Sequence, residues 1–204
     1  QALYKQNPSS NADMNNVAIG HSAGFEITTG TNNIAIGAGA LDANTTASNN
    51  TAVGHAALTS NTTGSENIGV GHNSLFFNTT GSNNTALGKS ALSDNTTASN
   101  NTAVGKSALA ANTTGDANVA VGVEALDANT TGQRCIAVGA FALTSQTTAE
   151  DNTAVGRSAM LQTTTGASNT SIGKNSMFAN TTGANNVAVG LSALSSNTTA
   201  SDNT

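Results

Sequence analysis

The sequence predicts an all-β fold, a parallel β-solenoid or β-roll built from 17-residue coils. The first observation is a glycine that recurs every 17 residues without any insertion, from Gly20 to Gly190. The second is a Leu or Met column and a Val, Ile or Leu column at fixed offsets from that glycine. The third is that Gly, Asn and Thr in consecutive positions are poor helix formers. A fixed short period means that each coil stacks on the previous one, so residues at one offset form a column along the axis.

The four residues before each repeated glycine are the predicted strand of the coil. In Asn101-Thr102-Ala103-Val104, β-branched residues alternate with a small residue, which places Thr102 and Val104 on one face and Ala103 on the other. A second short extended piece is expected at the Leu column, which only Gly24 interrupts. The Asn-Thr-Thr-Gly and Asn-rich stretches between these pieces are turn residues that tolerate left-handed backbone and bond their own chain.

Two regions are expected along the chain. Residues 1–13 fall outside the repeat and are interpreted as a cap or as a linker from a preceding region. Residues 14–204 form one solenoid domain of about eleven repeats, and Thr204 stops in the middle of a repeat. An uncapped solenoid exposes strand edges that invite further pairing. The chain is therefore expected to be a piece of a longer protein or of an end-to-end filament.

The predicted core is thin, because each coil offers one Leu, one Val or Ile and two Ala. Burial of so few apolar groups does not offset the entropy of ordering 17 residues. We expect two further sources of stability, contact with neighbouring chains, with a homotrimer as the leading candidate, and an asparagine ladder. The ladder residues are Asn33, Asn50, Asn67, Asn84, Asn101, Asn118, Asn152, Asn169 and Asn186, with Asn203 at the end of the column.

Composition argues against several classes of partner. Charged residues make up 8% of the chain, the net charge is -5, and the six Lys and Arg are spread from Lys5 to Lys174. A nucleic-acid surface needs clustered cations, so no nucleic acid is expected to bind. No apolar run of about 20 residues is present, so no membrane insertion is expected. The single Cys135 cannot form an intrachain disulfide; it replaces a ladder asparagine and is interpreted as a neutral replacement.

No catalytic, cofactor or metal residue is predicted, and the chain is not expected to be an enzyme. His21, His55 and His72 share one column, but the same column continues with Lys and Arg, which is typical of a solvent-facing position. Asp and Glu lie at scattered offsets instead of forming a constellation.

The Asn-Thr-Thr column has two interpretations. As turn residues, its asparagines would form a second ladder; as N-x-[ST] sequons, they would be glycosylation sites. The sequon asparagines are Asn44, Asn61, Asn78, Asn95, Asn112, Asn129, Asn180 and Asn197, while Ile27, Gln146 and Thr163 interrupt the column. The paired threonines also suggest a surface that binds ice or a glycan. Adjacent residues in extended backbone point to opposite faces, however, which leaves one outward Thr column.

The strand motif N-x-A-[VI]-G, as in residues 33–37 and 186–190, resembles the head repeats of YadA-type trimeric autotransporter adhesins. The fuller unit N-T-A-V-G-x-x-A-L-x-x-N-T-T-G is similar to tandem repeats of phage tail fibres. The resemblance covers residues 15–204, although the coil is longer than the adhesin repeat by the N-T-T-G segment. It implies a left-handed, trimeric β-roll that acts as a stalk or a receptor-binding head.

Together these observations predict a non-enzymatic fibre or filament segment of a phage tail or a cell-surface appendage. Its role would be that of a spacer or an attachment element. Its partners would be copies of itself and a host-surface glycan or receptor, and its location would be extracellular, on a cell surface or on a virion. The alternative function is an ice- or glycan-binding solenoid that uses the Asn-Thr-Thr column.

Overall fold

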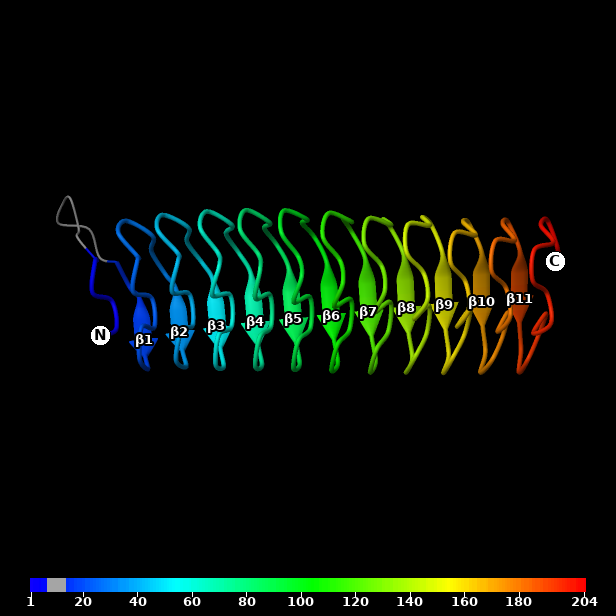
Figure 1. Ribbon diagram of the computed structural model, residues 1–204, viewed down its shortest axis with the longest axis horizontal. Helices are drawn as coiled ribbons and strands as arrows, with labels where there is room; N and C mark the ends of the chain where they lie inside the picture. The colour runs from blue at the N-terminus through cyan, green and yellow to red at the C-terminus, as the bar shows by residue number, and fades with distance from the viewer. Residues whose placement is uncertain (7–13) are drawn as a thin grey trace.

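The computed structural model describes residues 1–6 and 14–204 and shows a parallel β-solenoid with no helix among these residues. Each coil contributes one three-residue strand to a single parallel sheet, in which the eleven strands follow their order in the chain. The coils stack into a rod with the two chain ends at opposite ends (Figure 1). The strands are β1 (Val17–Ile19), β2 (Ile34–Ile36), β3 (Thr51–Val53), β4 (Ile68–Val70), β5 (Thr85–Leu87), β6 (Thr102–Val104), β7 (Val119–Val121), β8 (Ile136–Val138), β9 (Thr153–Val155), β10 (Thr170–Ile172) and β11 (Val187–Val189).

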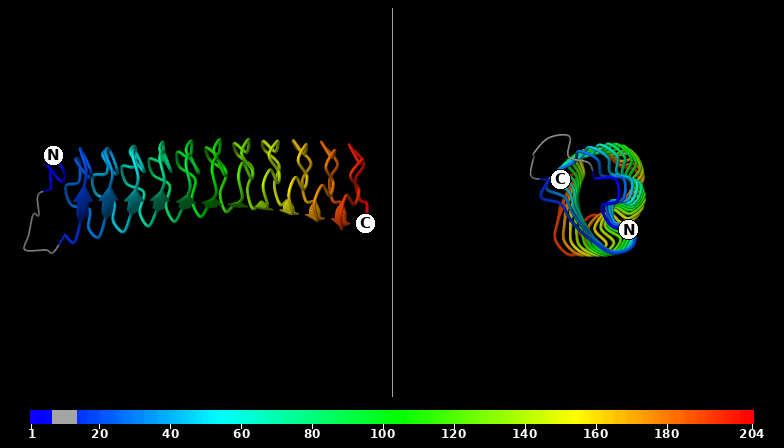
Figure 2. Two further views of the ribbon diagram at one scale, coloured as in Figure 1. Left: turned by 90° about the horizontal axis from the view of Figure 1, so that it is seen from below. Right: turned by 90° about the vertical axis from the view of Figure 1, so that its left-hand side faces the viewer.

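The strand register follows the sequence period. Thr102 of β6 pairs with Val119 of β7, and Val104 pairs with Val121, so paired residues are one coil apart. Backbone bonds between coils continue outside the strands; the amide of Leu109, for example, donates to the carbonyl of Ala125 at 2.9 Å. Seen along the axis, the coils follow one another as similar loops, each slightly offset from the one before it (Figure 2). The predicted fold class and coil length are therefore confirmed.

The core consists of one leucine or methionine and two small residues per coil. Leu109 is fully buried, with Ala103 from the strand and its neighbour Ala108 beside it. Leu109 and its equivalents have a left-handed backbone, with φ 54° at Leu109, and the residue two positions earlier, Ser107, is also left-handed. The second extended piece expected at the Leu column is thus wrong: the segment is a turn that directs the leucine inward.

The expectation that a Val or Ile joins this core is also wrong. Ala103 is buried whereas Val104 is only partly covered, and Ile172 and Val189 are exposed at the equivalent position. The physical reason is the alternation of the strand, which sends its first and third side chains outward once the middle residue points inward. The leucine and the two small side chains fill the interior, and the β-branched residues remain outside.

The first coil departs from the repeat and is covered by residues 1–6. The amide of Leu3 donates to the carbonyl of Ala23, as a Leu-column residue does in later coils, and the Tyr4 ring stacks on Phe25. Gly24 occupies the position of the usual leucine, and Leu3 and the buried Ile27 lie against it. Residues 1–6 therefore cover the first coil. The rest of the expected cap or linker, including Pro8, lies outside the described residues.

Candidate functional site: the outward strand face

One continuous face of the solenoid is made by the outward side chains of the strands. We call the first and third residues of β1 to β11 the strand face. The third position is always Ile, Val or Leu: Ile19, Ile36, Val53, Val70, Leu87, Val104, Val121, Val138, Val155, Ile172 and Val189. The first position is Thr in five strands and apolar in the others: Val17, Ile34, Thr51, Ile68, Thr85, Thr102, Val119, Ile136, Thr153, Thr170 and Val187. The face is therefore predominantly apolar along the whole sheet.

The strand face is a long apolar surface that is partly exposed. Its side chains are half-exposed or exposed, with Ile68 at 41% and Ile172 at 42%. Eleven strands at about 4.8 Å spacing give a strip roughly 50 Å long, with an apolar area on the order of 500 Å². Contiguous apolar patches of this size are often functional. A flat, regular face of this kind offers complementarity to another flat surface.

Charged residues border this face on both sides, as two files that we call its edges. The basic edge is the residue after each strand glycine and carries no acidic residue; its cationic and histidine members are His21, His55, His72, Lys89, Lys106, Arg157 and Lys174. The acidic edge is the pair of residues before each position of the first ladder, from Asn16 to Asn203. Its charged members are Glu66, Asp116, Arg134, Glu150, Asp151 and Asp202. Some of the Asp and Glu residues that are scattered in the sequence are thus brought into one file by the coil.

The histidine column lies on the basic edge and is exposed. The rings of His55 and His72 stack at 5.3 Å between centroids with an interplanar angle of 12°. No group of three or more His, Cys, Asp or Glu that could hold a metal ion occurs among residues 1–6 and 14–204. The same described ranges contain no pocket.

The sequon asparagines lie inside the coil. Asn61 is fully buried, and its Nδ2 donates to Oδ1 of Asn44 at 2.9 Å and to the carbonyl of Gly64 at 2.8 Å. Both amide hydrogens are therefore used, and a glycan on Nδ2 would have to leave the interior. The same burial holds at Asn44, Asn78, Asn95, Asn112, Asn129 and Asn180, while Asn197 of the last coil is partly exposed. In the folded solenoid the buried asparagines of this column form a second ladder and are not accessible acceptors.

The two threonines of each coil have different environments. The hydroxyl of Thr113 donates to the carbonyl of Thr130 in the next coil at 3.1 Å, whereas the side chain of Thr114 is exposed. The hydroxyl of the first threonine of such a pair is thus used in a hydrogen bond to the next coil. One exposed threonine file remains, as the alternation of side chains predicts.

The first asparagine ladder lies beside the strands. The backbone amide of Asn118 donates to Oδ1 of Asn101 at 2.9 Å, and Nδ2 of Asn101 donates to the carbonyl of Gly115 at 2.9 Å. Equivalent amide-to-Oδ1 bonds of 2.8–3.0 Å run from Asn16 to Cys135 and from Asn152 to Asn203. Each side chain therefore satisfies two backbone groups of the next coil, which compensates for the small apolar core.

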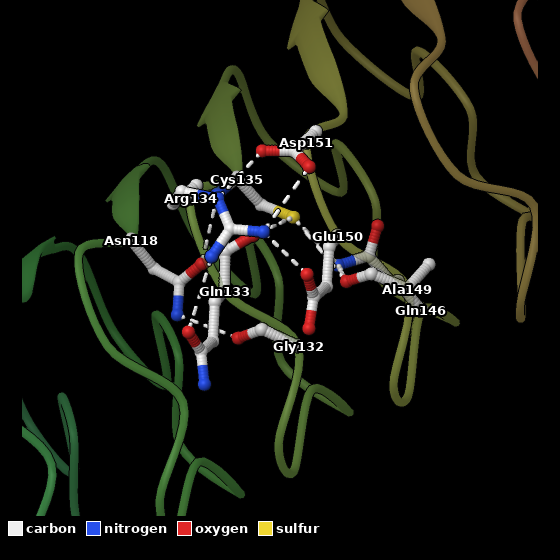
Figure 3. Close-up of polar contacts among 9 residues, drawn as sticks. All are labelled: Asn118, Gly132, Gln133, Arg134, Cys135, Gln146, Ala149, Glu150 and Asp151. Atoms are coloured by element: carbon white, nitrogen blue, oxygen red, sulfur yellow. Dashed lines mark hydrogen bonds and ion pairs between the residues drawn. The ribbon is translucent and has the colours of Figure 1, made fainter.

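Cys135 interrupts this ladder, and Gln146 of the second ladder replaces the missing amide group (Figure 3). Nε2 of Gln146 donates to Sγ of Cys135 at 3.1 Å and to the carbonyl of Ala149 at 3.1 Å. Its Oε1 accepts a bond of 2.8 Å from Nδ2 of Asn152. Gln146 is one methylene longer than the asparagine of other coils, and this length lets it reach across to the first ladder. Burial raises the pKa of the Cys135 thiol and disfavours the reactive thiolate.

Substitution of Gln146 is therefore expected to depend on residue 135. Gln146→Asn should lower the free energy of unfolding by about 1–3 kcal/mol, because the shorter amide leaves the buried Asn152 Nδ2 without its Oε1 acceptor. The double variant Cys135→Asn/Gln146→Asn restores the repeat and should regain at least that loss. A double-mutant cycle from urea denaturation measures the coupling. Additive effects of the two substitutions would contradict this coupling.

An ion-pair cluster that the sequence did not predict lies on the acidic edge (Figure 3). Nε of Arg134 donates to Oδ1 of Asp151 at 2.8 Å, and its Nη2 donates to Glu150. The hydrogen bond from Arg134 lowers the pKa of Asp151. Arg134 and Asp151 are 17 residues apart, so the signal available in the sequence was their equivalent position in adjacent coils.

These features define a class of protein: a parallel β-solenoid with two internal asparagine ladders and an apolar strand face between charged edges. Comparison of the chain with protein-family models, with curated proteins and with solved structures found no match. Within the described ranges, no helix has the length and apolar character needed to cross a membrane.

Proposed function

We propose that this chain is a non-enzymatic fibre segment whose copies associate through their strand faces, as a spacer or attachment element of a phage tail fibre or a cell-surface adhesin. The observation that supports the proposal is the apolar strand face, which runs from β1 to β11 without an interruption. Association with other copies would remove the apolar surface from water at every coil. A homo-oligomer of parallel rods would give the stiffness that a spacer requires.

Three copies are the favoured number. An apolar face can meet one copy about a two-fold axis, or several copies about an axis parallel to the rod. The resemblance of N-x-A-[VI]-G to the adhesin head repeat favours a trimer about the rod axis. The left-handed coil and the extracellular, cell-surface or virion location belong to the same proposal. A host glycan or receptor would then be bound along the rod or at a tip that the rod holds away from its base.

Native mass spectrometry and sedimentation equilibrium test the oligomeric state. We expect a particle of three chains, and we expect Val104→Lys/Val121→Lys to dissociate it, because two lysines per chain would be buried in the apolar contact. Both valines face outward, so the single chain should keep its fold, which circular dichroism checks.

Thr114→Lys/Thr131→Lys is the matched control, because it adds the same charge to the exposed threonine file on two neighbouring coils. This variant should remain trimeric. A wild-type chain that is monomeric at high concentration would refute the proposed assembly, and dissociation by both variants would show that charge alone, and not the strand face, controls it.

A further inference from the structure

Most of the cationic side chains of the chain are gathered on the basic edge. Seven of the nine Lys, Arg and His residues lie there, although the chain as a whole has a net charge of -5. All seven are exposed. They extend from His21 to Lys174, and at about 4.8 Å per coil this part of the edge is roughly 43 Å long. An acidic protein thus presents one extended line of cationic and histidine side chains.

The cations of this edge are largely without partners in their own chain. Lys5 and Arg134, the two Lys and Arg residues that lie elsewhere, each contact a carboxylate at 2.8 Å. Four Lys and Arg residues lie on the edge. Among the residues that the structure describes, only Lys106 of these four has an ion pair, with Glu124 at 3.5 Å. The acidic residues of the chain therefore leave most of this edge unneutralised.

Neighbouring cations of the edge lie one coil apart and repel one another. The amide of Ser107 donates to the carbonyl of Lys89 at 2.9 Å, which places Lys89 and Lys106 in adjacent, hydrogen-bonded coils. Arg157 and Lys174 are also exactly one 17-residue coil apart. A coil spacing of about 4.8 Å is shorter than the screening length of about 8 Å in physiological salt, so the like charges are poorly screened. An anion bound along the edge would remove this repulsion.

Backbone and polar side-chain groups add hydrogen-bond donors along the same edge. Within the described part of the chain, the backbone amides of the seven edge residues donate to no protein acceptor. A backbone N–H without a protein partner is satisfied by water or by a ligand. The residue that follows the edge position is a half-buried Ser or Asn in several coils, as at Asn73, Ser90, Ser107 and Asn175. The cation and the N–H group suit a carboxylate or a sulfate, and the hydroxyl or amide suits a sugar hydroxyl.

The length and composition of the edge favour an acidic polysaccharide as the ligand. A small anion would contact one or two coils, whereas the basic residues are spread along most of the rod. No Phe, Tyr or Trp occurs at an edge position, so the edge offers no platform on which the bases of a nucleic acid could stack. An acidic polysaccharide carries its charges at intervals along an extended chain, with hydroxyl groups between them. This pattern is complementary to the alternation of cations and small polar groups on the edge.

We infer that the basic edge binds an acidic polysaccharide lengthwise, with carboxylate or sulfate groups on the cations of successive coils. The inference rests on the proposed function, since it assigns the chemistry and the binding site of the glycan partner. The basic edge borders the strand face without being part of it, so association of the copies places the edge at the rim of the apolar contact, where a ligand can reach it. Contacts at several coils act together, which makes the binding multivalent.

The first experiment titrates the full chain with polygalacturonate in a calorimeter, and the highly methyl-esterified polymer serves as the neutral counterpart. We expect polygalacturonate to bind, more weakly as salt is added, and the ester not to bind. Lys89→Gln/Lys106→Gln should lower the affinity on the order of tenfold. Lys5→Gln/Arg134→Gln is the matched control, because it removes two positive charges that lie off the edge, and it should bind as the wild type does. An equal loss in the two variants would overturn the inference.

The second experiment looks for a gain of affinity. Val123 and Ala140 are uncharged and interrupt the basic edge between Lys106 and Arg157. Val123→Lys/Ala140→Lys should therefore strengthen the binding of polygalacturonate on the order of tenfold. Thr114→Lys/Thr131→Lys adds the same charge to the exposed threonine file and should leave the affinity nearly unchanged. Equal gains would show that the overall charge of the chain controls the binding, which contradicts a site on the edge.

Two further probes identify the ligand class. Dextran sulfate, compared with dextran, tests sulfate in place of carboxylate, and single-stranded polydeoxythymidylate tests a nucleic acid. Binding of polydeoxythymidylate as tight as that of the acidic polysaccharides would reject the assignment to a glycan, as would failure of both polygalacturonate and dextran sulfate to bind. Sedimentation equilibrium in the same buffer separates this result from the proposed assembly. A trimer that binds neither polysaccharide overturns the inference alone, whereas a monomer that binds through the edge overturns the assembly alone.

Discussion

Gly105→Ala is expected to destabilise the solenoid by more than about 3 kcal/mol. Gly105 has φ 134°, a conformation that costs a residue with a side chain about 1–3 kcal/mol. An added Cβ would also lie 2.5 Å from the carbonyl oxygen of Gly122, which is backbone of the next coil. That oxygen can move away only if the two coils separate. Urea denaturation followed by circular dichroism measures the loss as a lower midpoint.

Gly190→Ala is the matched control, because it separates strain from collision. Gly190 has nearly the same backbone angle, φ 128°, but nothing lies within 4 Å of its added Cβ. The free energy of unfolding of the Gly190→Ala variant should fall by the strain energy alone, about 1–3 kcal/mol. Equal losses of stability at Gly105 and Gly190 would show that the close approach of neighbouring coils does not contribute to the effect of Gly105→Ala.

Leu109→Ala is expected to lower the free energy of unfolding by about 2–5 kcal/mol, the usual cost of an emptied core position. Leu109 is fully buried and is the one large side chain that its coil contributes to the core. Its backbone is already left-handed, and alanine would keep the strain of that conformation without the packing that compensates for it. The loss is measured by the same denaturation assay, with the far-ultraviolet spectrum as a check of the fold.

Leu194→Ala provides the comparison at the last coil. Leu194 has a similar backbone angle, φ 48°, but it is 37% exposed because no further coil covers it among the described residues. Its replacement by alanine should therefore lower the free energy of unfolding by well below half of the loss at Leu109. A comparable loss at both positions would mean that the leucine column stabilises its own turn and not the stack.

Much of the fold followed from the period of the sequence. Repetition of Gly20 to Gly190 predicted the parallel stack, and the alternation in residues 101–104 predicted that Ala103 points away from Thr102 and Val104. The sequence pattern left open which of these two faces is internal. Hydrophobicity alone predicts that Val104 joins the core, whereas the leucine turn fills the interior and leaves Val104 outside.

The candidate site was predicted less completely for the same reason. The basic column from His21 to Lys174 was visible in the sequence, but its place at the border of an apolar face depends on the direction of the strands. The cooperation of Gln146 with Cys135 depends on two ladders that lie 11 residues apart in sequence and within hydrogen-bond distance in the coil. Periodicity records which residues share a column but not which columns are neighbours.

By itself, the sequence determined that this protein is a stack of 17-residue coils, because an uninterrupted glycine period permits only equivalent turns. It also determined which residues form each column. Only the tertiary structure decided which columns lie inside. The leucine turn and the two asparagine ladders occupy the narrow interior, where their groups are buried and hydrogen-bonded, so the larger strand side chains are left on the surface. The glycine that marks the period also marks the end of the strand face, next to the basic edge.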